Sequence, residues 1–163
     1  MSYYIIIRGP AGVGKTTIAK SLGERLGATY NSFDEVLKKN KLEMSDGRGI
    51  AKESFLKANE MVINQVKKEL EDGKIVIMDG CFYHKDQLKD LEESLLFEHF
   101  IFDLKAKVED CIARDKGRKS IGEDAIRAVH TMVSEFDYGV PIKTGGKTAE
   151  GVVDEIMKIL KIH

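Results

Sequence analysis

The chain has 163 residues, the length of one compact domain with a single core, and we expect residues 1–163 to form one domain. Hydrophobic residues make up 42% of it and charged residues 33%, which excludes a disordered or collagen-like chain, and no apolar run is long enough to predict a membrane span. The 26 Lys and Arg residues against 27 Asp and Glu leave a net charge of −1, which does not indicate nucleic-acid binding, so any recognition of phosphate must be local.

Short apolar segments alternate with longer segments of helical periodicity, which is typical of a parallel sheet covered by helices. Strands are predicted at residues 3–8, 28–31, 75–79, 100–104 and 138–142. The first, third and fourth have continuous apolar runs, so we expect them in the middle of the sheet. The last contains Pro141, which cannot donate a ladder hydrogen bond, and this favours an edge position.

Seven helices are predicted between and after these strands, at residues 15–26, about 33–39, about 50–72, 85–95, 108–115, 123–135 and 149–162. The longest carries an apolar stripe at steps of three and four residues, and Gly73 stands where a left-handed C-terminal cap is expected. Three charged stretches that contain glycine, 45–49, 116–122 and 144–147, are candidate mobile loops.

Cys81 and Cys111 are the two cysteines. They have no CxxC spacing and no neighbouring histidine cluster, and the N-terminus does not have the pattern of a signal peptide. We therefore expect a cytoplasmic protein without a disulfide or a structural zinc site.

The strongest motif is the segment Gly-Pro-Ala-Gly-Val-Gly-Lys-Thr at residues 9–16, which fits GxxxxGK[ST] at every fixed position. It lies directly after an apolar strand and before a helix, where backbone N–H groups and the helix dipole favour a phosphate. Lys15 is expected to bridge the β- and γ-phosphates, and the Thr16 hydroxyl to coordinate Mg²⁺. The residues expected to bind the nucleotide phosphates are Gly9, Ala11, Gly12, Val13, Gly14, Lys15, Thr16 and Thr17.

Asp79 ends the third predicted strand, at the edge of the sheet where ligands of open α/β folds bind. We expect it to hold Mg²⁺ or one of its waters, in the manner of a Walker B aspartate. The alternative is that Asp79 caps the next helix, but residues 80–84 intervene.

Asp34 follows the second strand at the same edge of the sheet. Ser32 and Glu35 have capping-box spacing, so one interpretation is that Asp34 only complements the helix dipole. The other is catalytic, because transfer of a phosphoryl group to an alcohol needs a carboxylate that orients the hydroxyl and accepts its proton. Both interpretations are compatible, since a helix start would hold Asp34 facing the phosphate site.

Arg114 and Arg118 stand four residues apart near a helix end, before Gly122 and another helix. A guanidinium group suits the stabilisation of a transferring phosphoryl group, because its planar fork bonds bidentately and stays ionised. A solvated helix end with favourable cations is the structural alternative. The phosphate loop favours the functional interpretation.

This order of features resembles the small P-loop kinases of metabolites and nucleic-acid ends, which include adenylate, shikimate and gluconate kinases. It is most similar to chloramphenicol phosphotransferase, zeta toxin and polynucleotide kinase, which share the phosphate loop, an acid after the second strand, a strand ending in Asp and an Arg-x-x-x-Arg lid. The resemblance implies an α/β three-layer P-loop NTPase fold, with a five-stranded parallel sheet in the order 2-3-1-4-5, helices on both faces and a short lid at about residues 114–122.

The resemblance also implies roles for single residues. Lys15, Asp34 and Arg118 would be catalytic, with Asp34 activating the acceptor and Arg118 reaching the phosphates. Arg114 would stack on the adenine of ATP, and Asp79 would act with Thr16 on Mg²⁺.

Two departures from the family pattern concern the acceptor. Adenylate kinases usually carry an arginine soon after the second-strand acid, whereas this chain has lysines at 38 and 39. This argues against a phosphorylated acceptor, with Arg48 and Arg127 as other sources of positive charge. The glycine run of shikimate kinases after the third strand is absent, and Tyr83 and His84 stand there, as pocket residues or as structural ones.

We therefore expect an enzyme that uses ATP and Mg²⁺ to phosphorylate a hydroxyl group of a small molecule or of a nucleic-acid end. One alternative is a nucleoside or nucleotide kinase. A second alternative is a non-kinase ATPase or nucleotide switch, which needs a positioned water and partner-binding loops rather than an acid such as Asp34 and an arginine lid.

Overall fold

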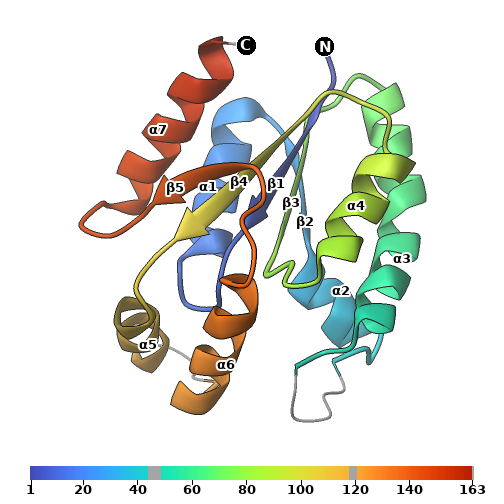
Figure 1. The fold of residues 1–163 in the computed structure, drawn as a ribbon. Coiled ribbons are helices and arrows are strands. Elements are labelled where there is room, and N and C mark those ends of the chain that lie inside the picture. The colour runs from blue at the N-terminus through green and yellow to red at the C-terminus, as the bar shows by residue number, and fades with distance from the viewer. Residues whose placement is uncertain (44–48, 118–120, 163) are drawn as a thin grey trace.

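The computed structural model describes residues 1–43, 49–117 and 121–162. Its centre is a five-stranded parallel sheet in the order β2-β3-β1-β4-β5, which confirms the predicted fold and strand order (Figure 1). The strands are β1 (Tyr4–Arg8), β2 (Thr29–Ser32), β3 (Val76–Gly80), β4 (His99–Lys105) and β5 (Val140–Lys143). The three predicted central strands are central, and the strand with Pro141 lies at an edge, paired with β4.

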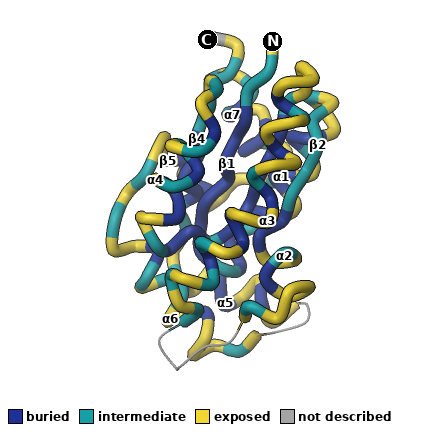
Figure 2. Tube along the Cα trace, turned by 90° about the vertical axis from the view of Figure 1, so that its right-hand side faces the viewer, coloured by how far each residue is buried: buried dark blue, intermediate teal, exposed yellow. Residues whose placement is uncertain are grey.

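Successive residues of β1 point to opposite faces of the sheet, and each face has its own apolar core. Tyr4 and Ile6 belong to one core, while Ile5 and Ile7 belong to the other. All five residues of β1 are buried, and the strand forms the dark centre of the tube in Figure 2. Burial on both faces explains why this strand reads as a continuous apolar run.

Helices cover both faces of the sheet (Figure 1). The core that contains Ile6 includes residues of α2 (Phe33–Lys39), α3 (Lys52–Glu71) and α4 (Lys85–Ser94). The core that contains Ile5 includes residues of α1 (Lys15–Leu26), α5 (Val108–Lys116), α6 (Glu123–Val133) and α7 (Ala149–Ile162). Gly73 follows α3 with a φ of 83°, the left-handed conformation expected there.

Three element ends differ from the prediction by two residues, and side-chain contacts account for two of them. The helix predicted from residue 50 begins at Lys52, because Tyr83 and His84 hydrogen-bond to the N–H and the carbonyl oxygen of Ile50. The helix predicted to reach residue 135 ends at Val133, whose carbonyl oxygen accepts a hydrogen bond from Arg8. The last strand begins at Val140 rather than at 138.

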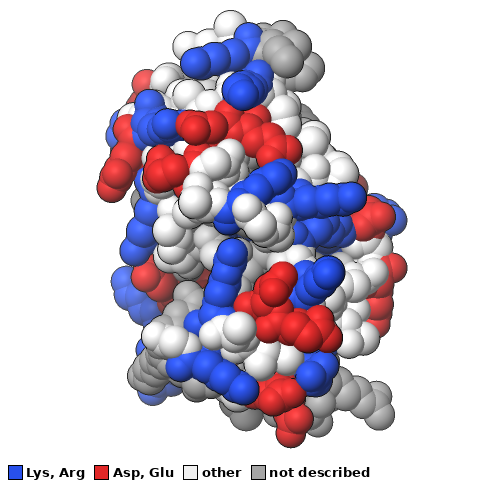
Figure 3. All heavy atoms as spheres, turned by 90° about the vertical axis from the view of Figure 1, so that its left-hand side faces the viewer, with Lys and Arg blue, Asp and Glu red and all other residues white. Residues whose placement is uncertain are grey.

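The loop between β1 and α1, the start of α2, and helices α5 and α6 all lie at the end of the sheet away from the two termini (Figure 1). On the face that includes α5 and α7, basic and acidic side chains are interspersed (Figure 3). Within the described residues, no helix is long and apolar enough to cross a membrane.

Candidate active site

The glycine-rich loop links β1 to α1 and packs closely on α5. Gly12 and Gly14 have φ angles of 84° and 99°, a region that glycine adopts without strain. A Cβ atom on Gly12 would lie 2.5 Å from the carbonyl oxygen of Cys111, so only glycine fits there. Gly14 is the N-cap of α1, and no side chain caps this helix start. The first N–H groups of α1 are therefore left for an anion.

Lys15 begins α1 and is only 6% exposed. Its Nζ donates a hydrogen bond to the carbonyl oxygen of Pro10, 3.1 Å away, across the loop. Burial disfavours the ammonium form, but the neighbouring acidic groups of Cys81, Asp34 and Asp79 outweigh it and raise the pKa of Lys15. Lys15 is therefore charged at neutral pH.

Asp79 is fully buried near the end of β3, opposite Ile7 of β1 and thus beside the start of the loop. Its Oδ2 accepts a hydrogen bond from the hydroxyl of Tyr30, and its Oδ1 has no hydrogen-bond partner among the residues that the structure describes. Burial raises the pKa of Asp79 to about 6, opposed by Tyr30 and Lys15. The N-cap of α4 is His84, so Asp79 is not the cap of the next helix.

Asp34 lies in the first turn of α2 with its side chain exposed. The predicted cap is confirmed, because the Ser32 hydroxyl accepts a hydrogen bond from the N–H of Glu35 at 3.3 Å. Asp34 borders two cavities. The first, the phosphate-loop cavity, is lined by Ala11, Gly12, Gly14, Lys15, Thr16, Asp34, Asp115 and Ile121. The first turn of α2 thus contains both the helix cap, formed by Ser32, and a residue that lines the phosphate-loop cavity, Asp34.

The second cavity bordered by Asp34 has a volume of about 690 Å³, and we call it the large pocket. Its buried floor includes Leu37, Phe55 and Tyr83, and it reaches Ala11 of the phosphate loop. Exposed charged residues line it as well, namely Asp34, Glu35, Lys38, Glu43 and Asp124. Its position next to the loop and its apolar floor suit an organic molecule that meets the phosphates at Asp34.

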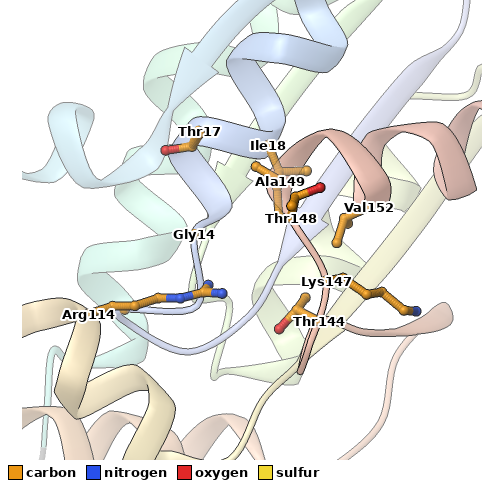
Figure 4. A pocket seen from close by; sticks show the side chains of 10 residues that line it. Gly14, Thr17, Ile18, Arg114, Thr144, Lys147, Thr148, Ala149 and Val152 are labelled. Carbon is orange, nitrogen blue, oxygen red and sulfur yellow. The ribbon is translucent and has the colours of Figure 1, made fainter.

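Arg114 of α5 points toward the phosphate loop (Figure 4). Its Nη1 donates a hydrogen bond to the carbonyl oxygen of Val13 at 2.5 Å. It borders a third cavity of about 280 Å³, the side pocket, together with Thr17 of α1, residues 144, 147 and 148 between β5 and α7, and Ala149 of α7. Arg114 therefore stands at the outer side of the loop, on a concave surface large enough for part of a nucleotide.

The remaining predicted site residues either lie outside the described part of the chain or make contacts that stabilise the fold. Arg118 and Arg48 lie outside the described residues. Arg127 is paired with Glu123 on the surface of α6, at 2.9 Å. The Tyr83 hydroxyl and the His84 ring both bind the backbone of Ile50, so these side chains hold the segment before α3, while Tyr83 also lines the large pocket.

Two features of the site were not predicted from the sequence. Tyr30 contacts Asp79 from the neighbouring strand, and a tyrosine in a short strand carries no motif that reveals such a contact. Thr144 lies in a segment predicted to be a mobile loop. It is buried, and its N–H and its hydroxyl both donate to the carbonyl oxygen of Lys105.

The role of Arg8 was also not predicted, because it lies at the end of the apolar strand β1. It is fully buried directly before the phosphate loop, and its Nη1 lies 2.7 Å from Oδ2 of Asp103 on β4. It also donates to the carbonyl oxygens of Phe82, Val133 and Phe136. Arg8 therefore connects the start of the phosphate loop to the end of α6.

A family model described as an AAA domain, AAA_18, matches residues 5–130 of the chain. The matched residues include the phosphate loop, Asp34, Asp79 and Arg114. The chain belongs to this AAA family. A relative of this AAA domain from Pyrococcus abyssi, named "Putative adenylate kinase", is 31% identical over 158 residues, which are 96% of this chain and 83% of the relative. The adenylate kinase of Mycobacterium marinum is 28% identical over 172 residues, 93% of each chain.

Solved structures share the fold of this AAA domain. A sugar kinase from Janibacter sp. HTCC2649 has a TM-score of 0.84 at 15% identity, covering 99% of this chain and 96% of that one. The shikimate kinase of Acinetobacter baumannii, solved with shikimate, has a TM-score of 0.64 at 19% identity, covering 99% and 93%. With the relatives above, they identify the chain as a kinase-type enzyme of the P-loop fold.

Proposed function

We propose that this enzyme transfers the γ-phosphate of ATP to a hydroxyl group of a small molecule, with Mg²⁺ as the metal. The observation that carries the proposal is the position of Asp34. The Asp34 carboxylate borders both the phosphate-loop cavity and the large pocket. Transfer of a phosphoryl group from a nucleotide in the first cavity to an acceptor in the second needs a base at this position.

The phosphate side is supported by three features of the loop. The uncapped start of α1 suits the phosphate oxygens, and the charged Lys15 lies buried beside them. The residues present also fit a metal ion, because Asp79 offers a buried oxygen without a hydrogen-bond partner and Thr16 offers an exposed hydroxyl. Among the described residues, no group of three or more His, Cys, Asp or Glu side chains forms a metal site of its own. A magnesium site shared with the nucleotide phosphates needs only one or two protein ligands.

In the proposed reaction, Asp34 orients the acceptor hydroxyl and accepts its proton while the oxygen bonds to the γ-phosphorus. The bond from that phosphorus to the β-phosphate oxygen breaks, and ADP leaves. Bound Mg²⁺ would neutralise charge on the phosphate oxygens. Lys15 would stabilise the charge on the β- and γ-phosphates, Arg118 would approach them from the lid, and Arg114 would hold the adenine.

The acceptor would occupy the large pocket, whose apolar floor favours a molecule with an apolar portion. The names of the relatives favour a second candidate, a nucleoside or nucleotide kinase. The net charge of −1 gives no support to a nucleic-acid end as the acceptor.

The test is a screen of the purified enzyme with ATP and Mg²⁺ against pooled alcohols and sugars, nucleosides, nucleoside monophosphates and 5′-hydroxyl oligonucleotides. The readouts are ADP and the mass of the product. We expect a phosphorylated small molecule, and we expect Asp34→Asn to abolish its formation while nucleotide binding persists. Phosphorylation of a nucleoside or its monophosphate alone would favour the second candidate, and ADP without any phosphorylated product would favour the ATPase alternative.

A further inference from the structure

Tyr30 is placed where it controls the orientation of the Asp79 carboxylate. The two residues lie on neighbouring parallel strands, with Tyr30 opposite Ile77 and Ser32 opposite Asp79. Side chains alternate along a strand, so Tyr30 and Asp79 project from the same face of the sheet, two residues apart in level. The Tyr30 hydroxyl spans this diagonal and donates a hydrogen bond to Oδ2 of Asp79.

The two oxygens of Asp79 are therefore not equivalent. Oδ2 accepts a hydrogen bond from Tyr30, whereas Oδ1 is buried, and no residue within 1–43, 49–117 or 121–162 hydrogen-bonds to it. A buried carboxylate oxygen without a partner costs free energy, so such an atom in a native fold calls for a partner that the protein itself does not supply. The charges of Lys15, Asp34 and Glu35 act on Asp79, and the first two belong to residues that line the phosphate-loop cavity.

The Tyr30 hydroxyl also lies beside the start of α1. Burial and Asp79 raise the pKa of this hydroxyl, and the side chains of Ser32 and Thr16 act against that rise, so both lie near it. Tyr30 thus hydrogen-bonds to Asp79 and lies near Thr16, the two residues that would hold Mg²⁺, and it belongs to the shell behind them. Groups in this position orient metal ligands and raise metal affinity without touching the metal.

We infer that Tyr30 is a positioning residue for the metal and phosphate site. Its hydroxyl holds Oδ2 of Asp79 so that Oδ1 is directed to the metal or its water. The inference rests on the proposed Mg²⁺-dependent phosphoryl transfer. The alternative is that Tyr30 only packs, because its half-buried ring contacts the core and the Lys20 ammonium lies 5.9 Å from the ring centroid.

The substitution Tyr30→Phe separates these explanations, because it removes the hydroxyl and keeps the ring with its packing. Tyr138→Phe is the matched control. Tyr138 is also half-buried, and its hydroxyl also donates to a carboxylate, that of Glu92 on α4. Glu92 contacts His99, which is opposite Tyr4 at the start of β1, so this pair lies at the end of the sheet away from the phosphate loop. Both variants lose one hydroxyl and one hydrogen bond, so a general effect on stability will appear in both.

The measurement is binding of ADP by calorimetry, with Mg²⁺ titrated from zero and with EDTA, alongside thermal unfolding of each variant. We expect Tyr30→Phe to require about 10-fold or more additional Mg²⁺ for the metal-dependent gain in affinity, the effect usual for loss of a group behind a metal ligand. Binding in EDTA should match the wild type, and Tyr138→Phe should match it under every condition. An unchanged Mg²⁺ requirement in Tyr30→Phe would overturn the inference, as would an equal loss of affinity in EDTA.

Asp79→Asn, measured in parallel, distinguishes failure of the inference from failure of the function. If Asp79→Asn raises the Mg²⁺ requirement and Tyr30→Phe does not, the metal site stands and Tyr30 is only a packing residue. If neither substitution changes the requirement, the assignment of the metal to Asp79 is wrong, and the inference falls with it.

Discussion

The substitution Asp34→Asn tests the catalytic assignment, because the catalytic and the structural interpretations of this residue predict different results. Asp34 is exposed, and the helix start is already capped by Ser32, so its structural contribution is limited to the interaction of a first-turn acid with the helix dipole. That interaction is worth about 0.3–1 kcal/mol. At about 2–4 °C per kcal/mol for a chain of this size, Asp34→Asn should lower Tm by roughly 1–4 °C.

The catalytic interpretation predicts a far larger effect on the reaction. Loss of a general base lowers the rate about 10²- to 10⁴-fold, so kcat should fall by at least two orders of magnitude with ADP affinity retained. Glu35→Gln is the matched control, because Glu35 lies in the same first turn, is equally exposed and also lines the large pocket, but does not line the phosphate-loop cavity. The assay pairs thermal unfolding with turnover on one preparation of each variant. If both variants have the same modest effect on kcat, Asp34 is not the base.

Four further substitutions test the site and its packing. Arg114→Ala should weaken nucleotide binding, measured by calorimetry, with little change in Tm; unchanged affinity would leave Arg114 only as a tie to Val13. Gly12→Ala should destabilise the protein by about 2 kcal/mol or more, because Gly12 has a positive φ and a Cβ atom there would lie 2.5 Å from a backbone oxygen. Gly23→Ala inside α1 should stabilise the protein by about 0.5–1 kcal/mol, because the nearest atom to a Cβ there is at 3.6 Å. Similar shifts in Tm for the two variants would refute the packing argument. The pKa of Asp79 rises from 3.8 in the unfolded chain to about 6 in the fold, so its ionisation destabilises the nucleotide-free protein as pH increases through this window. Asp79→Asn should therefore be the more stable protein at pH 7 by about 3 kcal/mol and lose most of this advantage near pH 4, which unfolding at both pH values will check.

The sequence predicted most of the fold because its signals are local. A buried parallel strand requires a continuous apolar run, and the motif at residues 9–16 requires glycines at fixed positions, so both are visible without the structure. The boundaries at Ile50 and Val133 were missed because distant side chains, His84 and Arg8, bind the carbonyl oxygens of these two residues.

The candidate site was predicted less completely, because some of its contacts join residues that are distant in the sequence. Asp34 follows the end of β2 and Asp79 lies next to the end of β3, and the carboxyl ends of parallel strands meet at one edge of the sheet. Tyr30 of β2 hydrogen-bonds to Asp79 on the neighbouring strand β3, and Thr144 lines the side pocket from the segment that follows β5. No sequence spacing indicates either of these positions.

The fate of the γ-phosphate is the most direct test of the proposed reaction. The enzyme is incubated with Mg²⁺, an acceptor identified by the screen and ATP labelled at the γ-phosphorus, and the label is followed in the acceptor ester and in inorganic phosphate. Phosphoryl transfer predicts label in the ester in an amount equal to the ADP formed, and no such ester with Lys15→Ala. Release of the label only as inorganic phosphate, at a rate that the acceptor does not change, would contradict it.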